Sequence, residues 1–292
     1  MTHSVFSNVR ALPLGLMIGL GLAAAAPEQA RSDAMSAQER GGQIVSSDEM
    51  VQIRVLPGWI INDGSHIAAL HLTLAPGWKT YWRAPGDAGI PPALDLSGSR
   101  NLSHVTPVWP TPAVFSQNGM KTVGYDDELI LPLHVVPQVA GQPAQVSARM
   151  QIGVCSSICV PLEFDFMLDL PAAGSDPQQA MIRTALADQP VTAREAKVSK
   201  VACTLTPIRD GLGLSVEIDM PSAGKTETVL IETSDPQVWV AETDSSRSGG
   251  RLNARTELVH VSGQAFALDR SGLRFTVLGS DHAVDIHGCT GP

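Results

Sequence analysis

Hydrophobic and polar residues alternate along much of this chain, and this two-residue period limits the fold more than any other feature. In the segment 162–169, LEFDFMLD, apolar residues occupy the even positions, while acidic residues and Met167 occupy the odd ones. The period predicts strands with one buried and one exposed face. It recurs in four earlier segments: 51–55, 67–74, 129–136 and 146–154. With Asn62-Asp63-Gly64 as a turn and Gly and Pro between the strands, the pattern favours a β-sandwich.

The period is interrupted before residue 200 and returns after it. The segment 176–189, DPQQAMIRTALADQ, has instead the pattern of a helix, with Asp176 as its cap and Pro177 in its first turn. Further strands are expected at 212–218, 228–232, 237–241, 265–268, 273–278 and 283–286. A chain of this length suggests about two domains. We therefore expect an all-β protein with two β-sandwich domains, 45–172 and 200–292, joined by a short helical linker at 173–199.

The first 26 residues have the composition of a secretory signal peptide. They contain one Arg (Arg10), no acidic residue, an apolar run at 12–22 and small residues at 23–26. The polar segment 27–44 is expected to be a flexible tether. No later apolar run approaches the roughly 20 residues that span a bilayer. These features predict an exported, periplasmic protein that does not span the membrane.

The charge of the chain excludes several classes of function. The formal net charge is −9, from 20 basic and 29 acidic side chains, and the sequence has no basic stripe. Nucleic acid is therefore not an expected partner, nor is an anionic membrane surface. No phosphate-cradling loop, nucleophile-elbow motif or zinc-protease motif occurs, and no cofactor is expected.

The four cysteines form two pairs with different spacing. In an oxidising compartment disulfides are the default for Cys155 and Cys159, within QIGVCSSICVP, and for Cys203 and Cys289. In the loop-entropy model a bond that closes about five residues stabilises by roughly 2 kcal/mol, and one that closes about 86 by roughly 4.6 kcal/mol. We therefore interpret Cys203–Cys289 as a structural disulfide that ties the first strand of the second domain to its last.

Two interpretations of Cys155 and Cys159 are open from the residues alone. The pair lies where one predicted strand ends and the next begins, so it could clamp a hairpin or carry electrons as a dithiol. No Lys, Arg or His lies within five residues of either cysteine, so nothing near in sequence would lower a thiol pKa. An accessible disulfide can still be attacked by the thiolate of a partner.

Two other groups of residues resemble possible sites. His282, Asp285, His287 and Cys289 could suggest a metal site, but Cys289 has a disulfide partner and the two histidines fall on opposite faces of a regular strand. The methionines are scattered, so no metal is expected. Most tryptophans are expected in the first core, although Trp78 and Trp82, beside Tyr81, could contribute to a docking surface.

Several motifs together resemble the N-terminal domain of the DsbD and ScsB thiol-disulfide interchange proteins, in a free-standing form. They occur in the family's order over about residues 45–172: GWKTYW at 77–82, PGDAG at 85–89, Trp109-Pro110, Gly124-Tyr125, Leu131-Pro132, Val154-Cys155 and ICVP at 158–161. The resemblance implies an immunoglobulin-like sandwich. It also implies that Cys155 and Cys159 are the catalytic pair, a role that favours the carrier over the clamp.

The resemblance also implies a cap, partners and an order of attack. Phe115 would shield the pair, although the acidic residues that precede it in DsbD are missing here, and Cys159 would be the sulfur that engages a partner. The electron donor would be a separate membrane-embedded DsbD/CcdA-like or thioredoxin-like protein, and the acceptors oxidised periplasmic proteins, with cytochrome c biogenesis as one setting. The alternatives are a non-enzymatic binding or assembly module with two structural disulfides, or a copper-related binding protein.

Overall fold

The structure of the chain is a computed structural model that describes residues 43–47, 49–86, 88–117, 120–170 and 179–291. The predicted signal peptide, most of the predicted tether, and the expected helix cap at Asp176 and Pro177 lie outside these residues. No helix in the described part is long and apolar enough to cross a membrane.

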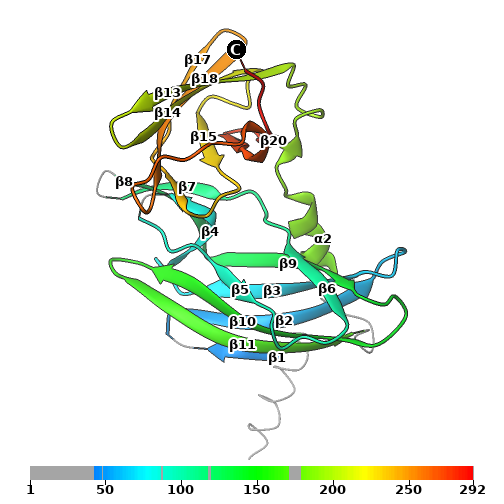
Figure 1. The fold of residues 1–292 in the computed structure, drawn as a ribbon. Coiled ribbons are helices and arrows are strands. Elements are labelled where there is room, and N and C mark those ends of the chain that lie inside the picture. The colour runs from blue at the N-terminus through cyan, green and yellow to red at the C-terminus, as the bar shows by residue number, and fades with distance from the viewer. Residues whose placement is uncertain (1–42, 48, 87, 118–119, 171–178, 292) are drawn as a thin grey trace, which may run out of the picture. The chain divides into compact units, whose positions relative to one another are not determined.

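The first sandwich consists of two antiparallel sheets (Figure 1). One sheet has the order β1 (Gln43–Ser47), β2 (Val51–Ile60), β3 (His66–Leu74), β9 (Glu128–Pro137) and β6 (Leu102–Pro107). The other has the order β11 (Cys159–Leu170), β10 (Ala144–Cys155), β4 (Lys79–Gly86), β8 (Met120–Asp126) and β7 (Ala113–Gln117), and the short β5 (Ala93–Asp95) also pairs with β10.

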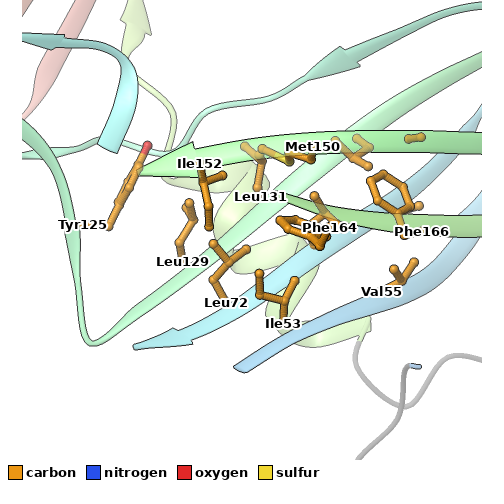
Figure 2. Close-up of a cluster of buried hydrophobic side chains, with 14 of the residues drawn as sticks. Ile53, Val55, Leu72, Tyr125, Leu129, Leu131, Met150, Ile152, Phe164 and Phe166 are labelled. Atoms are coloured by element: carbon orange, nitrogen blue, oxygen red, sulfur yellow. The ribbon is translucent and has the colours of Figure 1, made fainter. Parts of the chain in front are cut away.

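The core of this sandwich is formed by the inward-facing side chains of both sheets. Ile53, Leu72 and Leu131 from one sheet pack with Met150 and Phe164 from the other, as Figure 2 shows. The alternation expected in β11 is confirmed: its even-numbered side chains from Phe164 to Leu168 are buried, whereas Met167 is 61% exposed. The hairpin expected around Asn62-Asp63-Gly64 is also present, between β2 and β3.

Helix α2 (Gln179–Ala187) covers part of the outer face of the first of these sheets. Its Ile182 is fully buried against Leu56, Ile67 and Ala69 of β2 and β3. Strand β3 is therefore apolar on both faces, since its even-numbered residues point into the sandwich core and Ile67 and Ala69 point to the helix.

The second sandwich has its own core and again two sheets. One has the order β12 (Val191–Thr192), β20 (Ala283–His287), β19 (Arg274–Gly279) and β15 (Glu227–Glu232). The other has the order β13 (Lys200–Ile208), β14 (Gly211–Asp219), β18 (Arg251–His260) and β16 (Val238–Val240), with β17 (Asp244–Ser248) also paired to β18. Leu214, Leu252, Phe275 and Val277 are among the side chains that fill its core.

The predicted all-β, immunoglobulin-like fold of two domains with a short helix is confirmed, and one expected strand is wrong. Residues 265–268 form no strand, because Asp269 caps the short 3-10 helix η1 (Arg270–Gly272) directly after them, and Phe266 and Leu268 pack on the second core from a loop. The alternation also missed β18, because small or polar residues such as Ala254 and Thr256 occupy its inward positions.

We predict that Ile182→Ala lowers the free energy of unfolding of the first sandwich by about 3 kcal/mol, because it leaves a cavity between α2 and the sheet. Urea denaturation followed by tryptophan fluorescence measures this, since four of the five tryptophans lie in the first sandwich. The control is Thr184→Ala on the exposed side of α2, which should change the value by less than about 0.5 kcal/mol. Equal effects of the two substitutions would contradict the packing described for Ile182.

Candidate functional site

The site is built on the end of the β10–β11 hairpin. The two strands pair along their whole length, and the last pair in the register is Cys155 opposite Cys159. The two cysteines form a disulfide, and the Ser156 amide donates to the Ile158 carbonyl across the turn at 3.0 Å. Their exposure differs sharply: Cys155 is 5% exposed, whereas Cys159 is an exposed residue. Cys159 is thus the more accessible residue of the pair for an incoming partner.

Lys79 continues the row of residues that contains the two cysteines. It lies directly opposite Cys155 in the β10–β4 pairing and directly opposite Asp126 in the β4–β8 pairing. Directly opposite residues in antiparallel strands share a face, with Cβ atoms about 5 Å apart. The sheet therefore provides Cys155 with a cationic neighbour, Lys79, that is far away in the sequence. The search for basic residues within five positions of the cysteines could not find it.

Tyr81 supplies a hydroxyl group at the exposed sulfur. Its oxygen lies 3.4 Å from Sγ of Cys159. A sulfur in a disulfide carries no proton, so the hydroxyl is the donor in this contact. The Tyr81 side chain is 6% exposed, and burial raises the pKa of its phenol above the usual range. The phenol is therefore protonated at neutral pH and can also donate to a thiolate at Cys159.

Two glycines leave the space that the Tyr81 ring occupies. A Cβ atom on Gly153 would lie 3.0 Å from a ring carbon of Tyr81 and 2.6 Å from Cβ of Ile90. A Cβ atom on Gly89 would lie 2.9 Å from another ring carbon and 2.3 Å from Cβ of Pro85. Neither position has room for a side chain, so glycine at both positions leaves the space in which the Tyr81 ring reaches Cys159.

Phe115, the expected cap residue, lies on the face that carries the cysteines. The β7–β8 register pairs Phe115 with Thr122 and Ala113 with Gly124, and Gly124 pairs with Tyr81. Phe115 therefore shares a face with Tyr81 and Lys79. Nζ of Lys79 lies 4.8 Å from the centroid of the Phe115 ring, a cation–π contact. Lys79 is thus paired with Cys155 through its backbone and contacts Phe115, the expected cap, through its side chain.

The segment that leads into β7 is held at its base by two motifs of the resemblance. The Tyr125 hydroxyl donates to the Pro110 carbonyl at 2.8 Å, and the Tyr125 ring stacks with Trp109 at 6.5 Å between centroids. The amide of Thr111 also donates to the carbonyl of Asp188, just beyond α2, at 2.6 Å. Trp109-Pro110 and Gly124-Tyr125 therefore set where the strand with Phe115 begins.

The second disulfide joins β13 to the end of the described chain. Cys203 is fully buried in the second core and is bonded to Cys289. Beside it, the Cys203 amide donates to the Thr290 carbonyl at 2.9 Å, and the Thr290 amide donates to the Val201 carbonyl at 3.0 Å. This pair lies within a packed sheet edge and has no hydroxyl contact of the kind seen at Cys159 among the described residues.

Three of the four residues that could suggest a metal site, Asp285, His287 and Cys289, have other partners. Arg274 donates two hydrogen bonds to Asp285, at 2.7 and 2.8 Å, and Nε2 of His287 lies 3.1 Å from the same carboxylate. Burial alone would raise the pKa of Asp285, but the Arg274 guanidinium lowers it below the usual value. Over the residues that the structure describes, no group of three or more His, Cys, Asp or Glu side chains is arranged to hold a metal ion.

Of the two tryptophans beside Tyr81, Trp82 is not available for docking. Trp82 is completely buried in the first core, and Trp78 packs against that core. Trp82 thus lies in the core, as expected for most tryptophans, and the docking alternative fails for it because the alternation of GWKTYW points Thr80 and Trp82 inward and Lys79 and Tyr81 outward. The exposed apolar residue beside the disulfide is Ile158, which is 64% exposed in the turn between the cysteines.

Comparisons with known proteins concern the family of the first sandwich and the fold of the chain. Residues 43–171 match the model of the family described as thiol:disulfide interchange protein DsbD, N-terminal. The chain is similar in structure to the N-terminal periplasmic domain of ScsB from Proteus mirabilis, with 23% sequence identity and a TM-score of 0.66. That likeness covers 86% of this chain and 97% of the other, so it extends into the second sandwich. No curated protein matches the chain.

We predict that Tyr81→Phe raises the pKa of the Cys159 thiol by about one unit, because a hydrogen bond to a thiolate favours the charged form. The measurement uses a chain with Cys155→Ser, in which Cys159 is the single free thiol, and follows thiolate absorbance against pH. A chain with both Cys155→Ser and Cys159→Ser provides the blank for tyrosine ionisation.

Gly153→Ala should raise the same pKa although it keeps the hydroxyl, because the added methyl group displaces the ring. The matched control is Gly213→Ala in β14, where the nearest atom to a new Cβ is 3.5 Å away, an ordinary contact. If neither Tyr81→Phe nor Gly153→Ala moves the pKa, the phenol has no influence on Cys159.

Proposed function

Because residues 43–171 form a domain of the DsbD N-terminal family, we propose that this chain is a thiol-disulfide exchange protein in which Cys155 and Cys159 cycle between disulfide and dithiol. The observation that carries the proposal is the unequal exposure of the two cysteines. Cys159 is exposed and lies beside a protonated phenol. Its disulfide partner Cys155 is buried. A hairpin clamp needs neither this asymmetry nor a hydroxyl donor at one sulfur.

Reduction of the pair begins with a thiolate of a partner dithiol. It attacks Sγ of Cys159, a bond forms between the two sulfurs, and the Cys155–Cys159 bond breaks. The electron pair of that bond goes to Sγ of Cys155, which leaves as a thiolate on the same sheet face as Lys79. The second thiol of the partner then attacks the mixed disulfide and releases Cys159, so the partner ends as a disulfide and this chain as a dithiol.

The reduced pair passes both electrons on by the reverse chemistry. The Cys159 thiolate, with Tyr81 as its hydrogen-bond donor, attacks the disulfide of an oxidised protein. Cys155 then attacks Cys159 in the mixed disulfide, which restores the internal bond and releases the reduced client. Cys159 is thus the sulfur that engages partners in both directions, and Phe115 on β7 is the side chain that shields the pair between encounters.

We assign the protein to the periplasm, with residues 1–26 as the signal peptide. The ScsB domain that it resembles is described as periplasmic, and a compartment of that kind keeps a second, structural disulfide oxidised. The proposed electron donor is a membrane-embedded DsbD/CcdA-like or a thioredoxin-like protein, and the acceptors are oxidised periplasmic thiol-disulfide proteins. Cys203–Cys289 is proposed to stabilise the second sandwich and to take no part in exchange.

We predict that Cys155→Ser, which leaves Cys159 exposed and without its resolving partner, accumulates mixed disulfides in periplasmic extracts. Cys159→Ser leaves only the buried Cys155 and should trap at least about tenfold less, because thiol exchange requires access to the sulfur. Non-reducing gel electrophoresis and mass spectrometry of the adducts measure both.

The chain with both substitutions is the control for adducts through other cysteines. Exchange through this site would be contradicted by a Cys155→Ser chain that forms no more adducts than the double variant. Equal trapping by the two single variants would contradict the assignment of Cys159 as the engaging sulfur.

A further inference from the structure

A cleft of about 570 Å³ lies where the two sandwiches meet. One side is lined by β4, β7 and β8 and by the loop after β4, and the other side by β15 and β16. The two sandwiches are packed together here, since Leu278 and Ala283 of the second are buried in the core cluster of the first. The volume lies within the usual range for ligand sites, about 300–1,000 Å³.

Strand β15 turns a free edge to this cleft. It is the last strand of its sheet and pairs with β19. The Val229 amide donates to the Ser245 hydroxyl of β17 at 3.0 Å, so the odd-numbered amides of β15 point away from β19. Ile231, the next of them, is 6% exposed, and its amide has no hydrogen-bond partner among the residues that the structure describes. Because buried amides are nearly always paired, this position favours a ligand with a carbonyl group.

Strand β16 turns a second free edge to the cleft, since it ends the other sheet of the second sandwich. The Ala241 amide donates to the Glu257 carbonyl at 2.9 Å. The Val261 amide donates to the Gln237 carbonyl at 2.8 Å, so the odd-numbered residues here carry the pairing with β18. Val240 therefore directs its amide away from β18, and in the described part of the chain this amide has no partner either. Free edges of this kind are templates for a further strand.

The charged side chains that line the cleft already have partners. Arg83 donates two hydrogen bonds to Glu232, each at 3.0 Å. Nζ of Lys121 lies 2.5 Å from Oε1 of Glu242. The carboxylate of Asp235 accepts a hydrogen bond from a backbone amide at 2.9 Å. The apolar side chains of the lining include Val114, Val123, Val238, Trp239 and Val261. An occupant with a charge would find no free partner here, and burial of an unpaired charge is costly, so the cleft favours an uncharged occupant.

We propose that this cleft binds an extended, uncharged segment of an exchange partner, whose backbone pairs as an added strand with the free edges of β15 and β16. Main-chain hydrogen bonds to the Ile231 and Val240 amides hold the segment, and the apolar lining takes its side chains. This rests on the proposed function, because it names the part of a partner that the chain recognises. The second sandwich thereby takes part in exchange as one wall of the binding cleft.

The cleft borders the surroundings of the disulfide. Gly89 lines the cleft, and a Cβ atom on it would lie 2.9 Å from the Tyr81 ring. The Tyr81 hydroxyl in turn contacts Cys159. Val114 also lines the cleft and is the neighbour of Phe115 on β7. This position favours a polypeptide partner, because the chain on either side of a bound segment is held near Cys159.

The test is calorimetric titration of the oxidised chain with a cysteine-free probe, a capped peptide of alternating valine and threonine. The probe should bind. The same peptide with alternate amides N-methylated should bind at least about tenfold more weakly, because it keeps the side chains but loses donors needed for strand pairing. Val240→Pro, which removes one free amide of an edge strand, should weaken binding of the probe about fivefold. Val240→Thr keeps the amide and should stay within about twofold of the parent chain.

A second substitution tests the cleft without any change in β16. Val114 is 37% exposed, so Val114→Glu should leave the fold intact, and its unpaired carboxylate in the cleft should weaken binding of the probe at least about fivefold. The matched control is Val139→Glu, at a position that is 46% exposed and does not line the cleft, which should leave binding of the probe unchanged.

Failure of the probe to bind, or equal binding of the probe and its N-methylated form, would overturn the inference. So would a dimer of the chain that Val114→Glu dissociates, because a second copy would then occupy the cleft. The probe has no cysteine, so failure of binding would leave the trapping of mixed disulfides unchanged, whereas failure of the proposed exchange would be visible in the trapping experiment alone.

Discussion

The pairing of β10 with β11 is the constraint on which both the core and the candidate site depend. Its register sets Phe164 and Phe166 opposite Met150 and Ala148 inside the sandwich, and the same register ends with Cys155 opposite Cys159. A slip by one residue would turn every side chain of the strand to the other face and separate the cysteines. Burial of the aromatic face therefore fixes the position of the disulfide.

The strands beside this hairpin give the two sulfurs different surroundings. Strand β4 places Lys79 opposite Cys155 and the Tyr81 hydroxyl at Cys159, and Gly153 of β10 leaves room for the Tyr81 ring. A buried sulfur near a cation suits a leaving thiolate, and an exposed sulfur near a protonated phenol suits the point of attack. The asymmetry between the two cysteines thus comes from ordinary pairing of antiparallel strands, and it is the feature on which the proposed exchange depends.

Much of the fold could be predicted from the sequence, because its main signals are local. The alternation at 162–169 gave the correct faces of β11, and the helical pattern at 176–189 contains α2. The contact of Lys79 with the site could not be predicted this way, since the register between β4 and β10 joins residues far apart in the chain and no local pattern specifies it. The alternation in GWKTYW could have placed Lys79 and Tyr81 together on one face. For Gly153, the need for glycine is evident only once the Tyr81 ring lies above it.

The most direct test of the central claim is a redox titration of the protein in glutathione or dithiothreitol buffers, with alkylation and peptide mass spectrometry that report each cysteine separately. The account predicts that Cys155 and Cys159 become reduced in the exchange-active range, above about −270 mV, while Cys203 and Cys289 remain bonded to below about −300 mV. If both pairs resist reduction together, the Cys155–Cys159 bond is a clamp, and the function proposed for this chain is wrong.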